Sequence, residues 1–126
     1  MIGDPIPHAV RELIAERLDS VPELEAVLLF RENPARAWTP EDAGTRLYVS
    51  TTVATHVLDT LTARGFFSAA EGAYRYQPES EDLAATVDAL ADAYRRHLVA
   101  ITELIHSKPS RQVRDFANAF RLRKPT

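Results

Sequence analysis

One stretch of the chain, residues 38–76, constrains the architecture more tightly than any other. Thr39 begins a helix, because its hydroxyl can cap free backbone N–H groups and the proline after it suits the first helical position. Ser50 begins a second helix after a short turn, and Gly65 ends that helix where a left-handed backbone is needed. Phe66-Phe67 is then typical of a strand, and Tyr74-Arg75-Tyr76 alternates like a returning strand. Glu71-Gly72 lies between them at the expected tip, so this segment predicts a β-hairpin. The stretch therefore predicts two helices, a tight turn between them, and a hairpin.

Apolar periodicity predicts further helices on both sides of this stretch. Spacings of three and four residues predict helices over residues 8–18 and 22–32, and again over 110–120. One long helix is predicted over residues 81–107, and at about 1.5 Å per residue it would be roughly 40 Å long. We expect part of its apolar stripe to pack on the first helix or to meet a second copy of the chain. The stripe residues expected at a dimer contact are Leu83, Val87, Leu90, Tyr94, Leu98, Ile101 and Ile105.

The order of helix, turn, helix and hairpin resembles the winged helix-turn-helix of bacterial transcription regulators, including the MarR-like family. The resemblance covers residues 8–78. It rests on Thr39-Pro40-Glu41, Leu47-Tyr48-Val49-Ser50, Leu58, Leu61 and Arg64-Gly65-Phe66. It implies a mainly α fold with a small β-hairpin wing, built as a winged helix-turn-helix domain over 1–78. The apolar stripe and the basic charges that follow predict a long helix and a basic helical tail over 79–126, which would form an arm for dimerisation or for binding a partner. Tyr48 departs from the family pattern, in which this turn position is usually small and often glycine.

The resemblance implies a homodimeric DNA-binding regulator of transcription. The helix over residues 51–64 would enter the major groove, and the hairpin over 66–77 would act as the wing. The same helix would bury Val53 or Ala54 in the core. The side chains expected at the DNA are Thr39, Arg46, Ser50, Thr51, Thr52, Thr55, His56, Arg64 and Arg75. This set is poor in the Arg, Lys, Gln and Asn that make bidentate contacts with base edges, and Asp59 would repel phosphate.

The distribution of charge keeps an alternative open. The chain has a net charge of -3, yet residues 106–124 carry six Lys or Arg against Asp115 alone. Nucleic-acid binders normally concentrate positive charge on the docking face. The alternative is a winged-helix module for protein–protein interaction that does not bind DNA directly and uses the arm and the basic tail Lys108–Lys124 to bind a partner. A third interpretation is a ligand sensor, with a pocket between arm and core lined by Trp38, Tyr48 or Tyr94.

Patterns for catalysis, metal binding and membrane insertion are missing from the sequence. The four histidines lie far apart, without a HExxH arrangement, and there is no phosphate-binding glycine loop and no GxSxG. The absence of cysteine excludes disulfides and thiolate metal sites. We therefore expect no enzyme, no catalytic residue, no metal and no cofactor. The first residues lack the features of a signal peptide and no apolar run is long enough to span a membrane, so we expect a cytoplasmic protein without a membrane partner. The excess of arginine over lysine and the abundant alanine fit a GC-rich bacterial genome.

Overall fold

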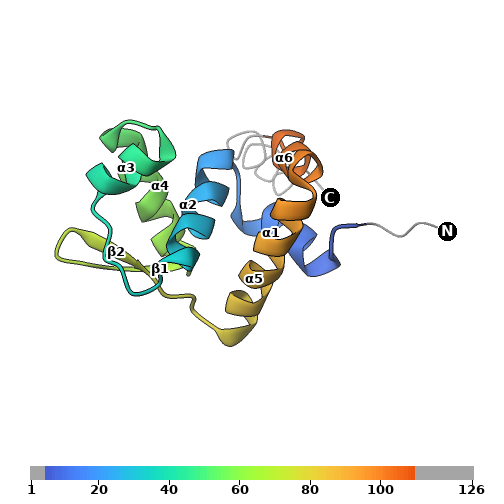
Figure 1. Ribbon diagram of the computed structural model, residues 1–126, viewed down its shortest axis with the longest axis horizontal. Coiled ribbons are helices and arrows are strands. Elements are labelled where there is room, and N and C mark those ends of the chain that lie inside the picture. The colour runs from blue at the N-terminus through green and yellow to red at the C-terminus, as the bar shows by residue number, and fades with distance from the viewer. Residues whose placement is uncertain (1–4, 110–126) are drawn as a thin grey trace, which may run out of the picture.

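The computed structural model describes residues 5–109 of the chain. These residues form six helices and one antiparallel two-stranded hairpin (Figure 1), which confirms a mainly α fold with a small β-hairpin. The helices are α1 (His8–Arg17), α2 (Val21–Glu32), α3 (Pro40–Leu47), α4 (Thr51–Ala63), α5 (Glu81–Arg96) and α6 (Leu98–His106), and the strands are β1 (Phe67–Ala70) and β2 (Ala73–Tyr76). The helix predicted over residues 110–120 lies outside the described residues.

The helix starts predicted at Thr39 and Ser50, and the stop predicted at Gly65, are confirmed. Ser20, Thr39 and Ser50 each accept a hydrogen bond from the backbone N–H three residues further on. Each such cap contributes about 1 kcal/mol to the stability of its helix. Gly65 has a φ of 92° directly after α4, and Gly72 has a φ of 77° at the hairpin tip. Glycine adopts these conformations without the clash that a Cβ atom would cause.

Trp38 attaches the hairpin to the helical core. Its side chain is fully buried, and its ring stacks on Phe30 with 5.3 Å between ring centroids. The backbone of Trp38 exchanges two hydrogen bonds of 2.8 Å with Tyr74 on β2. Phe67 on β1 stacks on the same Phe30 at 4.2 Å. Trp38 therefore lies in the core, where it joins α2, α3 and the hairpin.

The prediction of one continuous helix over residues 81–107 is wrong. The backbone breaks at His97 (φ -136°, ψ 51°), which ends α5 and precedes α6. His97 lies four residues from both Ala93 and Ile101, which are buried, so an unbroken helix would place an imidazole on the buried face. Both helices pack on α1, and α5 also packs on α2 (Figure 1). The stripe residues that the monomer itself buries are Leu83, Val87, Leu90, Ile101 and Ile105.

The described helices give no membrane-spanning segment. Within residues 5–109, none is both long enough and apolar enough to cross a bilayer.

Candidate nucleic-acid interface

Helix α4 is presented by α3 through a tight turn. Gly44 allows the close approach, since a Cβ atom there would lie 2.9 Å from the carbonyl oxygen of Val49. Tyr48 forms the turn with a left-handed backbone (φ 59°, ψ 41°), and its side chain is 95% exposed. A left-handed backbone favours glycine, which is why the winged helices that this chain resembles usually have a small residue or glycine at this turn position. Tyr48 departs from that pattern. Tyr48 thus adopts a strained conformation without the compensation of a buried ring.

The outward face of α4 is made mostly of threonine. Thr51, Thr52, Val53 and His56 are exposed, whereas Ala54 is buried, which decides between the two core candidates. The hydroxyl of Thr55, which is half-buried, donates to the carbonyl of Thr51 at 2.9 Å. Four of the predicted contact residues therefore come together on α4, and three of them are exposed.

The hydroxyls of Thr39 and Ser50 are engaged as helix caps. The oxygen of Thr39 accepts the N–H of Asp42 at 3.1 Å, and the oxygen of Ser50 accepts the N–H of Val53 at 3.1 Å. Each hydroxyl keeps its own proton to donate. Both residues are exposed and lie at helix N-termini, where the helix dipole favours an anion.

Three exposed arginines gather around the segment before α3. The guanidinium of Arg36 lies 3.8 Å from the centre of the Trp38 ring, and that of Arg46 lies 5.5 Å from it. Arg75 on β2 donates to the carbonyl of Ala35 at 3.4 Å. We call Arg36, Arg46 and Arg75 the arginine cluster. Sequence reasoning found Arg46 and Arg75 but missed Arg36, whose only signal was its position two residues before a core tryptophan.

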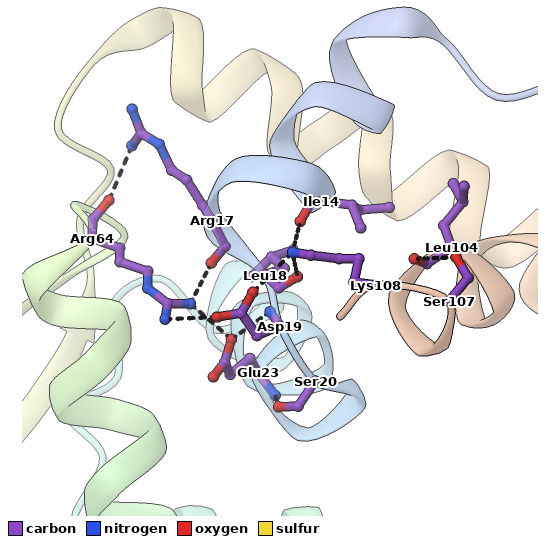
Figure 2. A network of polar contacts seen from close by, with 10 residues as sticks. All are labelled: Ile14, Arg17, Leu18, Asp19, Ser20, Glu23, Arg64, Leu104, Ser107 and Lys108. Carbon is purple, nitrogen blue, oxygen red and sulfur yellow. Dashed lines mark hydrogen bonds and ion pairs between the residues drawn. The ribbon is translucent and has the colours of Figure 1, made fainter. Parts of the chain in front are cut away.

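Arg64, predicted to contact DNA, lies instead in an ionic network inside the fold (Figure 2). Its guanidinium is 2.9 Å from the Glu23 carboxylate and 3.1 Å from the Asp19 carboxylate, and it donates to the carbonyl of Arg17 at 2.7 Å. Only 18% of its side chain is exposed. Arg64 therefore joins the end of α4 to the loop between α1 and α2, which removes it from the cations available to a phosphate.

Lys108 extends this network to the C-terminal side of the molecule (Figure 2). Its Nζ donates to the carbonyls of Ile14 at 2.5 Å and Leu18 at 2.7 Å, and pairs with Asp19 at 2.9 Å. A cation at this place adds a donor to carbonyls at the C-terminal end of α1 and complements the helix dipole. We call Asp19, Glu23, Arg64 and Lys108 the ionic network. Lys108, the first residue of the predicted basic tail, thus has a structural role, and the rest of that tail beyond residue 109 lies outside the described residues.

Asp59 is held by the hairpin. It accepts a hydrogen bond of 2.5 Å from the hydroxyl of Tyr74. This hydrogen bond, burial and the charge of Asp59 together raise the pKa of Tyr74 to about 12. Tyr74 therefore stays protonated at neutral pH and links β2 to α4. From sequence, Asp59 was only a charge unfavourable to phosphate, and the structure adds that it links the hairpin to α4.

A cavity of about 410 Å³ lies between α2 and α5. Of the three aromatics predicted to line a ligand pocket, only Tyr94 borders it, since Trp38 is buried in the core and Tyr48 lies at the turn. Arg31 and Asp88, which also line it, form an ion pair of 2.8 Å. Among residues 5–109, no group of three or more His, Cys, Asp or Glu is arranged to hold a metal ion.

The order and packing of α3, α4 and the hairpin are compatible with a winged helix. Comparisons with protein-family models, with characterised proteins and with solved structures found no match for this chain. The function is therefore argued from the side chains of the candidate interface.

Proposed function

We propose that this chain is a DNA-binding transcription regulator of the winged-helix type, resembling the MarR-like regulators. The observation that supports this most is the exposed, uncharged first half of α4, with Thr51, Thr52 and His56 outward, in a domain that also exposes the arginine cluster. The first residues of a recognition helix are those that contact base edges. The cluster arginines would then contact phosphates, which positions the domain without reading sequence.

The proposed binding depends on few cations. The arginine cluster supplies three, of which Arg36 also pairs with Asp42 at 3.6 Å, and the helix starts at Thr39 and Ser50 add backbone N–H groups that suit phosphate oxygens. Each neutralised phosphate releases a counterion, so binding weakens as salt concentration rises. A single copy of the domain would bind weakly, and we propose that a homodimer doubles the contacts.

Homodimerisation would use the apolar surface that the monomer leaves exposed. Most stripe residues are buried in one chain, but Leu98 and Val99 at the start of α6 are 53% and 66% exposed. We expect the double substitution Leu98→Glu and Val99→Glu to give monomers in light scattering under conditions in which the wild type is dimeric. Ala85→Glu, which adds a charge at an exposed site on α5, is the control and should leave the dimer intact. A wild type that is monomeric at micromolar concentration contradicts the proposal. Leu90 is unsuitable for this test, because it is fully buried and a charge there would unfold the chain.

Direct DNA binding is tested by selecting from a random duplex library with the purified protein and titrating the selected duplex with salt. We expect Arg75→Ala to weaken binding at least about tenfold and to lower the salt slope by about 2, since each chain of the dimer loses one phosphate contact. Arg95→Ala removes an exposed arginine of α5 that lies outside the arginine cluster, and should change neither quantity. Unchanged affinity for Arg75→Ala would remove the wing contact, and recovery of no sequence at low salt would overturn DNA binding as a whole.

The alternative function is a winged helix that binds a protein. The observation that favours it is the balance of charge. Residues 36–75 contain four arginines and four carboxylates, and one of these arginines, Arg64, is paired inside the fold, so this part of the chain has no excess of positive charge for DNA. Tyr48 adds an exposed aromatic ring of the kind enriched at protein interfaces. This alternative predicts that the selection recovers no DNA from protein that is folded by circular dichroism.

A further inference from the structure

The first turn of α4 carries three β-branched residues in succession, Thr51, Thr52 and Val53, and all three are exposed. Val53 is 44% exposed. β-branched side chains lose rotamer freedom in a helix and lower its stability slightly, and these three gain little burial in return. Neither helix propensity nor core packing explains their presence. Together they place four γ-methyl groups on the part of α4 that would lie nearest the bases.

Several polar groups along α4 are already engaged in hydrogen bonds within the domain. The hydroxyl of Thr55 donates to the carbonyl of Thr51 at 2.9 Å, and that of Thr62 donates to the carbonyl of Leu58 at 2.7 Å. The carboxylate of Asp59 is engaged by Tyr74. What α4 offers outward is therefore methyl groups, the hydroxyls of its first two threonines, the imidazole of His56 and the carboxylate of Asp59, one oxygen of which accepts from Tyr74.

Thymine presents the matching chemistry, because in the major groove it shows a 5-methyl group that the other standard bases lack. We infer that α4 recognises thymine by apolar contact between Val53, with the γ-methyls of Thr51 and Thr52, and the 5-methyl groups of the target. This inference rests on the proposed function and names its substrate class: duplex DNA with thymine at the positions facing the first turn of α4. The exposed arginine cluster in the same domain favours DNA as the occupant, since its guanidinium groups complement phosphates.

The test uses the best duplex recovered by selection, resynthesised with uracil in place of one thymine at a time. Uracil pairs with adenine as thymine does and lacks only the 5-methyl group. One methyl removed from an apolar contact should weaken binding about fourfold, from about 0.8 kcal/mol per buried carbon. We expect this loss at one or more thymines and little change at the others.

Val53→Ala identifies the side chain responsible. If Val53 contacts the methyl group, the ratio of uracil to thymine dissociation constants should fall from about fourfold towards one in the variant, since interacting groups are not additive. Val21→Ala, an equal truncation of a partly exposed valine at the start of α2, outside the proposed DNA and dimer surfaces, should keep the wild-type ratio. Because each ratio is taken within one protein, a general change in affinity cancels. Binding that is insensitive to uracil at every position, or a ratio equal in Val53→Ala and wild type, overturns the inference while DNA binding stands. Failure to recover any DNA overturns both.

Discussion

Replacing Trp38 with alanine is expected to lower the free energy of unfolding by about 4 kcal/mol, the cost typical of a buried tryptophan truncated in a core. Trp38 is fully buried, stacks on Phe30, and lies beneath the guanidinium of Arg36. Its removal leaves a cavity where α2, α3 and the hairpin meet. Urea denaturation followed by circular dichroism measures the change, as a lower midpoint with little change in slope.

Trp38→Phe distinguishes the contribution of ring stacking to stability from that of the indole N–H. The indole N–H of Trp38 is buried and has no hydrogen-bond partner among residues 5–109, so its loss removes an unfavourable group while a smaller ring remains to stack on Phe30. We expect Trp38→Phe to cost about 1.5 kcal/mol, well below the alanine variant. Equal losses for the two variants would show that ring stacking contributes little and that the hairpin is held by its backbone pairing alone.

Replacing Arg64 with methionine is expected to cost about 3 kcal/mol, because it leaves the partly buried carboxylates of Asp19 and Glu23 without their shared guanidinium. The carbonyl of Arg17 also loses a donor. Methionine keeps most of the apolar stem, so the loss reports mainly the ionic contacts. The same denaturation measurement, repeated at high salt, tests the result. A partly buried network is screened less than a surface pair, so most of the difference should persist.

Arg75→Met is the matched control for Arg64→Met. Arg75 is exposed and makes one long hydrogen bond of 3.4 Å, so its loss should change stability by less than about 0.5 kcal/mol. The two arginines were equivalent candidates for DNA contact from sequence, and the structure separates them. If both substitutions have the same small effect on stability, the ionic network does not hold α4 against the α1–α2 loop.

The candidate site was only partly predictable because its residues differ in how far away their partners lie. Thr51, Thr52 and His56 could be placed on the outward face of a helix from their spacing alone, and they are exposed. The partners of Arg64 lie at least 41 positions away in sequence, and Lys108 reaches back 94 positions to Ile14. Spacing along the chain carries no information about such contacts.

The sequence by itself determined the local architecture of residues 38–76. Caps at Thr39 and Ser50, the stop at Gly65 and the hairpin tip at Glu71-Gly72 act within a few residues, through hydrogen bonds to nearby N–H groups and through the backbone freedom of glycine. Only the tertiary structure decided that the arm breaks at His97, because the apolar stripe gains more by packing both halves on α1 than by staying straight. Likewise, only the folded chain decided which arginines remain exposed and which hold the fold together.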